Sequence, residues 1–138
     1  MSTTSVVLIG HAGYARGALE AVEMILGPQP GVRPVSMQPD KDPAEVVAEV
    51  REVADQTLKA DEDRLLILAD MFGGSPANAV AAAFLSDPRV GLVTGMNLPM
   101  LLETLIEAGA GGDVTATAVR AGTDGVVDAG ARLRSDAG

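Results

Sequence analysis

The feature that most constrains the fold is a regular alternation of short apolar runs with longer segments in which apolar residues recur at helical spacing. The runs at 6–9 and 65–69 are continuously apolar, as expected of strands buried on both faces of a sheet. Strands that alternate with helices along a chain are typical of βαβ units, whose strands pair in parallel. The sequence therefore predicts an α/β fold, with an open, mostly parallel sheet and helices on both of its faces.

Turn and capping residues set the bounds of the predicted elements. Strands are expected at 6–9, 32–37, 65–69 and 90–94, and helices at 15–26, 43–59, 75–85 and 98–108. Asp42 can cap the helix that Pro43 opens, because the first helical position leaves unpaired the N–H that proline lacks. Pro34 lies inside the second strand, and its missing N–H predicts that this strand forms an edge of the sheet.

The C-terminal part of the chain has a weaker pattern. Residues 114–120 are rich in β-branched side chains but could also form a helix, so both possibilities stay open. Residues 125–127 contain two valines and are a candidate for a short last strand. The ends, 1–5 and 131–138, are expected to fray. With no repeat or low-complexity linker, residues 1–138 are expected to form a single domain.

Charge and composition exclude several classes of function. The chain has 10 basic and 19 acidic residues, a net charge of −9, and only one tyrosine and two phenylalanines as aromatic residues. This charge would repel a nucleic acid, whose bases would also find few aromatic rings on which to stack. We therefore expect no nucleic-acid partner.

The absence of cysteine excludes disulfides and thiolate catalysis, and a single histidine leaves too few ligands for a structural zinc site. No clustered Asp and Glu motif suggests another metal, so no metal site is expected. The N-terminus lacks the features of a signal peptide, and no apolar run is long enough to span a membrane. The expected location is therefore the cytoplasm, without direct insertion into a membrane.

The only histidine, His11, directly follows the first predicted strand and stands between Gly10 and Gly13. With no cysteine in the chain, its imidazole is the group best suited to nucleophilic or proton-transfer chemistry near neutral pH. The two glycines indicate that the backbone bends tightly there or lets another group approach closely. From the local sequence, a reactive histidine and a histidine that merely lies in a loop both stay open.

Polar and glycine-rich segments follow two other predicted strands. Asp70 stands at the end of the third strand, before Gly73, Gly74 and Ser75, and Gly95-Met96-Asn97 follows the fourth. The carboxyl ends of parallel strands meet at one edge of a sheet, where ligands gather. A carboxylate there can hold one nitrogen of the imidazole and leave the other free. Ser75 is predicted to cap the following helix, whose amino end favours a phosphate or phosphoryl group.

Other interpretations of the same residues fit less well. Asp70 could be only a turn residue, and Ser75-Pro76 only a helix start. The segment 73–75 lacks the lysine and the spacing of a Walker loop, and 10–13 lacks the dinucleotide-binding pattern Gly-x-Gly-x-x-Gly. A hydrolase triad with Ser75 as nucleophile is disfavoured, because Gly-x-Ser-x-Gly is missing and Pro76 removes an N–H that an oxyanion hole would use there.

Three blocks of the sequence resemble one known family. They are Val7-Leu8-Ile9-Gly10-His11, Asp70-Met71-Phe72-Gly73-Gly74-Ser75-Pro76-Ala77-Asn78 and Gly95-Met96-Asn97-Leu98-Pro99-Met100-Leu101. Over roughly residues 6–127 the chain is similar to the enzyme IIA component of the mannose family of the phosphoenolpyruvate-dependent sugar phosphotransferase system (PTS). The phosphotransfer subunit of dihydroxyacetone kinase shares the fold and the first block, but the other two blocks favour the mannose type.

This resemblance implies a histidine phosphocarrier. His11 would accept a phosphoryl group from phospho-HPr and pass it to an enzyme IIB partner, with Asp70 as the carboxylate that orients the ring. The turn formed by Gly73, Gly74 and Ser75 would contact the phosphate. Transfer between two histidines needs no cofactor, so none is expected.

Three further residues, Gly13, Phe72 and Asn97, are expected to line the same site. The resemblance also implies a homodimer in which the last strand, near 125–128, is exchanged between subunits. An alternative function is a regulatory binding module, in which another protein reads the phosphorylation state of His11.

Overall fold

In the computed structural model, which describes residues 4–111 and 113–137, four parallel strands form one sheet. The strands are β1 (Thr4–His11), β2 (Val32–Met37), β3 (Arg64–Ala69) and β4 (Val90–Thr94). They lie in the order β2-β1-β3-β4, and each pairs with its neighbours in parallel. β2 is therefore an edge strand, as the proline within it predicts.

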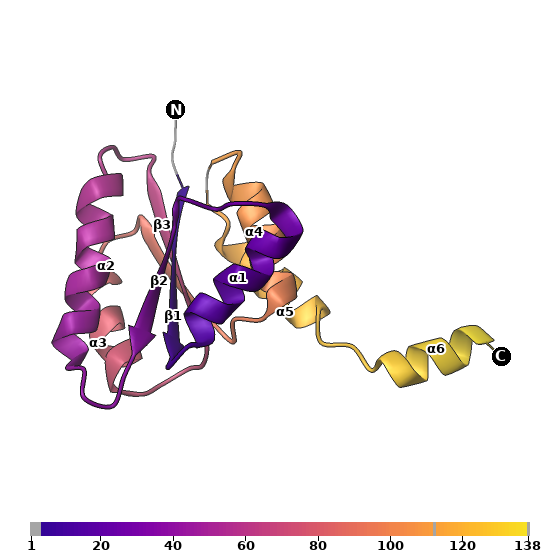
Figure 1. Ribbon diagram of the computed structural model, residues 1–138. Helices are drawn as coiled ribbons and strands as arrows, with labels where there is room; N and C mark the ends of the chain where they lie inside the picture. The colour runs from indigo at the N-terminus through magenta and orange to yellow at the C-terminus, as the bar shows by residue number, and fades with distance from the viewer. Residues whose placement is uncertain (1–3, 112, 138) are drawn as a thin grey trace.

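Helices cover both faces of this sheet (Figure 1). They are α1 (Tyr14–Leu26), α2 (Pro43–Thr57), α3 (Ser75–Phe84), α4 (Leu98–Ala108), α5 (Thr115–Asp124) and α6 (Ala129–Ala137). α2 and α3 pack on one face, whereas α1 and α4 pack on the other, with α5 against α4. The predicted α/β fold is confirmed, and the question left open at 114–120 is settled in favour of a helix.

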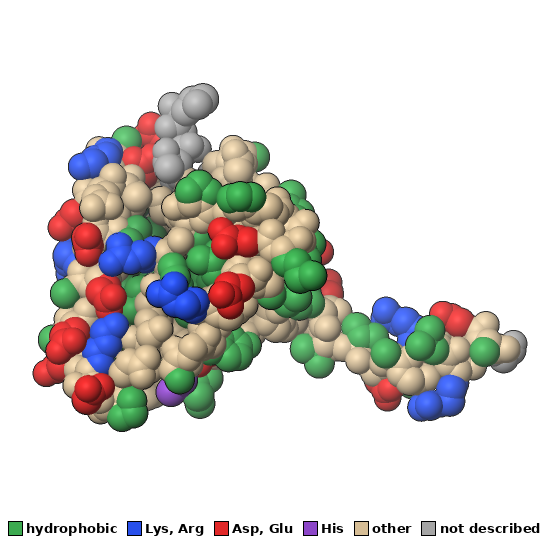
Figure 2. Space-filling view, in the orientation of Figure 1, with side chains coloured by type: hydrophobic (Ala, Val, Ile, Leu, Met, Phe, Trp, Pro, Cys, Tyr) green, Lys and Arg blue, Asp and Glu red, His purple; other side chains and the backbone are tan. Residues whose placement is uncertain are grey.

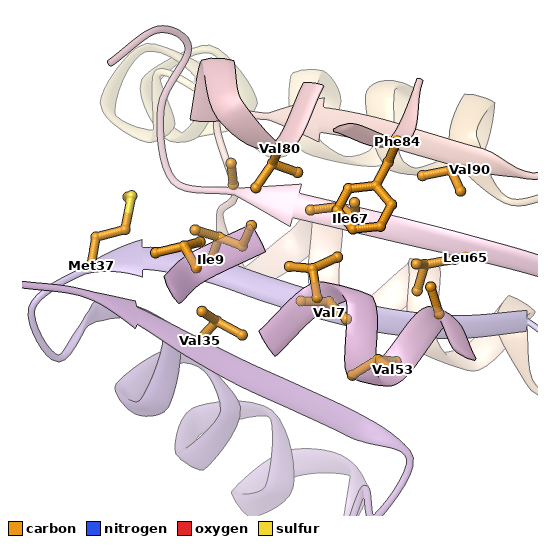
Figure 3. Close-up of a cluster of buried hydrophobic side chains, with 14 residues drawn as sticks. Val7, Ile9, Val35, Met37, Val53, Leu65, Ile67, Val80, Phe84 and Val90 are labelled. Carbon is orange, nitrogen blue, oxygen red and sulfur yellow. The ribbon is translucent and has the colours of Figure 1, made fainter. Parts of the chain in front are cut away.

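The sheet buries both of its faces, and its residues alternate between two hydrophobic clusters. In β1, Val7 and Ile9 belong to the cluster under α2 and α3, where Phe84 also packs (Figure 3). Val6 and Leu8 belong to the cluster under α1 and α4. These four residues of β1 are at most 3% exposed. A strand with no solvent face needs an apolar residue at every position, which explains the unbroken apolar run.

At the amino edge of the sheet, Arg89 connects the starts of β3 and β4. Its carbonyl accepts a hydrogen bond from Leu65 N at 2.9 Å. Its guanidinium donates to both carboxylate oxygens of Asp87, from Nε at 3.0 Å and from Nη2 at 2.8 Å. These hydrogen bonds lower the pKa of the Asp87 carboxyl to about 2. This ion pair lies where β4 begins.

The C-terminal segment differs from the sequence-based expectation. Residues 125–127 form no strand in the described structure; they link α5 to α6, and Val126 is 78% exposed. A strand needs the N–H and C=O groups of a neighbour, and residues 125–127 pair with no strand of the described sheet, whose order is β2-β1-β3-β4. The prediction of a short strand here is therefore wrong for the single chain.

Residues 129–137 form the helix α6. At the start of α6, Ala131 N donates to Asp128 Oδ1 at 2.9 Å and Arg132 N donates to Asp128 O at 3.1 Å. The signal that sequence reasoning overlooked is this capping aspartate. α6 extends away from the sheet and has no buried residue (Figure 1).

At the N-terminus, the first strand begins earlier than the sequence predicts. Thr4 and Ser5 lie within β1, whereas 1–3 and 138 lie outside the described residues. Among the described residues, no helix is both long enough and apolar enough to cross a membrane.

Candidate active site

His11 and Asp70 meet at the carboxyl edge of the sheet, because β1 and β3 are parallel neighbours that end side by side. A single carboxylate oxygen of Asp70, Oδ2, accepts two hydrogen bonds from His11. The backbone N–H donates at 2.8 Å, and Nδ1 lies at 2.9 Å. The N–H of Asp70 in turn donates to the carbonyl of Ile9 at 3.0 Å. Backbone and side-chain contacts together fix the imidazole relative to the carboxylate.

This contact determines which nitrogen of His11 is available for chemistry. An ionised carboxylate only accepts hydrogen bonds, so Nδ1 carries the proton and the lone pair of Nε2 is left free. The side chain of His11 is 60% exposed, whereas that of Asp70 is 11% exposed. The arrangement suits a nucleophilic imidazole that is open to solvent and oriented by a largely buried carboxylate.

Of the two glycines that flank His11, only Gly10 is required by the packing of the chain. A side chain at Gly10 would place its Cβ 2.9 Å from the N atom of Ala15, so the close approach of α1 requires glycine. Gly13 has a negative φ and open space at its Cβ position. The unusual backbone conformation falls on Ala12, with a φ of 49°, whose N–H donates to the carbonyl of Met37 at 2.9 Å.

The loop between β3 and α3 requires glycine at two positions. Gly73 and Gly74 have φ values of 91° and 89°, a left-handed conformation that other residues rarely adopt. Gly74 occupies the N-cap position of α3, and Ser75 is the first helical residue, before Pro76. The prediction that Ser75 caps this helix is therefore wrong, because the left-handed turn places the cap one position earlier.

The predicted phosphate-contacting residues, Gly73, Gly74 and Ser75, lie at the same edge of the sheet as His11. In the described structure they make no hydrogen bond with the imidazole. The first backbone N–H groups of a helix have no acceptor within it, so the amino end of α3 is electropositive. The loop therefore offers backbone donors close to the end of β3.

Two apolar side chains in this loop are exposed. Met71 and Phe72 directly follow Asp70, and they are 55% and 85% exposed. By contrast, the other phenylalanine of the chain, Phe84, is only 3% exposed. Figure 2 shows hydrophobic side chains beside the purple surface of the histidine, at the edge to which the strand arrows of Figure 1 point. Phe72 is two residues from Asp70 in the chain, so it lies at the edge of the sheet where the sequence predicts a site.

Asn97, another predicted site residue, connects two helices. Its Oδ1 accepts a hydrogen bond from Met100 N at 3.0 Å and so caps α4. Its Nδ2 donates to the carbonyl of Gly122 in α5, also at 3.0 Å. Asn97 and Gly13 line one groove between α1 and the start of α4. Both polar atoms of the Asn97 side chain are nevertheless engaged in structural contacts.

Tyr14 was not among the predicted site residues. Its hydroxyl donates to the carbonyl of Met96 at 2.6 Å, which connects the first turn of α1 with the loop that follows β4. Both segments lie at the carboxyl edge, so this bond fixes the start of α1 close to the histidine. No sequence pattern could identify the partner of Tyr14, because the two residues are 82 positions apart.

In the described part of the chain, neither His11 nor Asp70 contacts a lysine or an arginine through a hydrogen bond or ion pair. Residues 71–86 carry no charge at all. The described residues also contain no group of three or more histidine, aspartate or glutamate side chains that could hold a metal ion. The described contacts therefore define a pair of one imidazole and one carboxylate.

Comparison with known proteins gives the family. Residues 5–120 match the family described as "PTS system fructose IIA component". The sorbose-specific EIIA component of Lacticaseibacillus casei is 36% identical over 107 residues, which cover 75% of this chain and 72% of that protein. The fructose-specific EIIA component of Bacillus subtilis (strain 168) is 34% identical over 103 residues, which cover 73% of this chain and 68% of that protein.

The fold agrees with a solved structure of the same kind. The PTS IIA protein associated with the fucose utilization operon from Streptococcus pneumoniae matches with a TM-score of 0.81 at 27% identity, over 95% of this chain and 96% of that one. Sequence and structure comparisons therefore agree with the resemblance carried by the three sequence blocks. The chain belongs to the mannose family of enzyme IIA components of the phosphoenolpyruvate-dependent sugar phosphotransferase system.

Proposed function

We propose that this chain is a cytoplasmic histidine phosphocarrier, in which His11 accepts a phosphoryl group from phospho-HPr and passes it to an enzyme IIB partner. The double contact between His11 and Asp70, at 2.8 and 2.9 Å, carries the proposal, because it leaves Nε2 of the only imidazole free. Membership of the family supports the same role. The relatives are named for sorbose and fructose, which supports sugar uptake as the process that the phosphoryl group serves.

The transfer forms one bond and breaks one. The lone pair of His11 Nε2 attacks the phosphorus of phosphohistidine on HPr, and a new N–P bond forms. The P–N bond of the donor breaks, and its electron pair returns to the donor nitrogen. The ring of His11 gains positive charge, which the Asp70 carboxylate stabilises through the proton on Nδ1. Attack by a nucleophile of the IIB protein then takes the group from His11 in the same way.

In this proposal the start of α3 receives the phosphoryl oxygens. Gly73 and Gly74 have open space where a side chain would stand, so their backbone can be approached closely. The amino end of a helix binds anionic groups through its backbone N–H groups, and the Ser75 hydroxyl is a further donor there. These donors are neutral, which fits a group that must be released again.

Phosphorylation in vitro with phosphoenolpyruvate, enzyme I and HPr, followed by intact mass spectrometry, tests the proposal. The wild-type chain is expected to gain one phosphoryl group that is labile in acid and stable in base, as phosphohistidine is. The His11→Ala variant is expected to gain none, and its labelling would contradict the proposal. A second assay measures transfer of the phosphoryl group from His11 to a candidate IIB protein. Transfer is expected of a transport component, whereas a regulatory module would keep the group and be recognised by another protein in its phosphorylated state.

A further inference from the structure

We propose that Met71 and Phe72 form an apolar anchor on which the phosphoryl-donor protein docks. His11 is then served by a protein and not by a free phosphorylated metabolite. This inference rests on the phosphocarrier role proposed above, and it adds the surface by which the donor is recognised. The term "anchor" is used below for these two side chains only.

The first argument is exposure. Phe72 is 85% exposed and Met71 is 55% exposed, although the chain has only two phenylalanines and buries the other one, Phe84, in its core. Contact of so much apolar surface with water is unfavourable, and a partner that covers it gains the corresponding burial. Exposed aromatic residues are over-represented among the side chains that dominate binding between proteins.

The second argument is position. Asp70 is held by its own N–H, which donates to Ile9, and by its carboxylate, which binds His11. On the other side, Gly73 and Gly74 turn the chain into α3. The anchor spans the two residues between these fixed points, so it cannot move far from the imidazole. A donor that brings a phosphorylated side chain to Nε2 must therefore approach the edge of the sheet that carries the anchor.

The third argument is charge. Small phosphorylated metabolites carry several negative charges, and proteins bind them through arginine and lysine side chains. Neither His11 nor Asp70 contacts such a side chain in the described structure, and the whole chain carries a net charge of −9. Lys41, in the loop after β2, donates instead to the carbonyl of Ser36 at 2.8 Å and pairs with Glu49. The edge is therefore suited to an apolar protein surface that brings its own positive charges.

The test separates docking from chemistry by using two donors. Phosphorylation of Phe72→Ala and Met71→Ala is followed against the concentration of phospho-HPr, and separately with phosphoramidate, a small compound that phosphorylates histidine directly. Met24→Ala is the matched control, because Met24 is 90% exposed but stands near the far end of α1. Phe72→Leu keeps most of the apolar area and tests for rescue.

With phospho-HPr as donor, Phe72→Ala is expected to raise KM roughly ten- to a hundredfold, the effect of losing one buried aromatic side chain from an interface. Met71→Ala is expected to raise KM less, Phe72→Leu to restore most of the loss, and Met24→Ala to leave KM unchanged. With phosphoramidate, all of these variants are expected to react at the wild-type rate, because the contact between His11 and Asp70 is intact.

An unchanged KM in Phe72→Ala would overturn the docking inference while leaving the phosphocarrier role standing. A slower reaction of Phe72→Ala with phosphoramidate would also overturn it, since the ring would then act on the chemistry of His11 itself. If phospho-HPr fails to label the wild-type chain, the proposed function fails, and the inference fails with it. Phe72 is so exposed that its replacement by alanine removes no core contact, so the variant is expected to fold.

Discussion

The Oδ2 atom of Asp70 accepts hydrogen bonds from both the backbone and the ring of His11, so one atom sets the position and the protonated nitrogen of the imidazole. The other oxygen, Oδ1, is buried without a hydrogen-bond partner in the described structure. A buried carboxylate oxygen without a partner destabilises the folded state. The hydrogen bonds described for the Asp70 side chain therefore all use one oxygen, and both of them go to His11.

Replacement of Asp70 by asparagine is expected to keep the fold and to slow phosphoryl transfer to His11. An amide can still bond to the ring, but it cannot stabilise positive charge there, and its NH₂ group selects the other tautomer. The loss of one charge-assisted hydrogen bond corresponds to on the order of 1.5–3 kcal/mol, or roughly ten- to a hundredfold in rate. Rapid-quench kinetics with phospho-HPr measure this, and circular dichroism checks the fold. Transfer at the wild-type rate would mean that Asp70 is only a turn residue.

Among the secondary-structure elements, α4 and α5 are joined by several side chains, one of which is Asn97. Asn97 caps α4 through Oδ1 and holds the carbonyl of Gly122 through Nδ2. Close packing supports the same junction, since a Cβ at Gly122 would stand 2.6 Å from Cε of Met100. Asn97, which the sequence predicts to line the site, thus fixes α4 and α5 relative to each other.

Asn97→Ala is expected to lower the free energy of unfolding by about 1–3 kcal/mol, the sum of a lost helix cap and a lost hydrogen bond. Asn97→Asp keeps the capping oxygen but loses the donor to Gly122, so it separates the two contributions. Urea unfolding measures the stability of each variant, and labelling of His11 by phosphoramidate is expected to stay at the wild-type rate. A variant that is as stable as wild type but slow to react would instead place Asn97 in the chemistry.

At the scale of the whole molecule, β4 has a neighbour on one side only, which leaves its other edge open. A groove runs beside this edge and α5, lined by Val93, Thr94, Gly95, Asn97, Met100, Val119, Gly122, Thr123 and Val126. α6 projects away from the body and buries none of its own residues. An open strand edge and a projecting arm are the two parts that an exchange between identical subunits requires.

The homodimer stays a prediction, and removal of the arm tests it. A chain that ends after Gly125 keeps α5 but lacks the segment expected to be exchanged, so it is expected to be monomeric or to aggregate, whereas the full chain is a dimer. Light scattering at micromolar concentration measures the mass of each. The shortened chain is expected to keep the reaction of His11 with phosphoramidate, because the residues of the site remain. A full chain that is monomeric under these conditions would contradict the prediction.

Local sequence patterns predicted most of the fold. The strand patterns at 6–9, 32–37, 65–69 and 90–94 located the four strands of the described sheet, and the proline in β2 identified it as an edge strand. Helix bounds were close, as for the helix predicted at 43–59, which ends at Thr57. These signals are local in the sequence. An apolar run, a helix cap and a proline without an N–H each involve only a few consecutive residues.

The sequence by itself identified His11 as the candidate nucleophile, because the chain has one imidazole and no thiol. It also determined that this group follows a strand of a parallel sheet. Only the tertiary structure decided that a single oxygen of Asp70 binds both the backbone and the ring, and that Tyr14 reaches Met96. Likewise, it decided that the valines near 126 do not form a strand within one chain. Each of these outcomes depends on which residues far apart in the sequence come into contact. The pattern of residues along the chain does not specify such contacts.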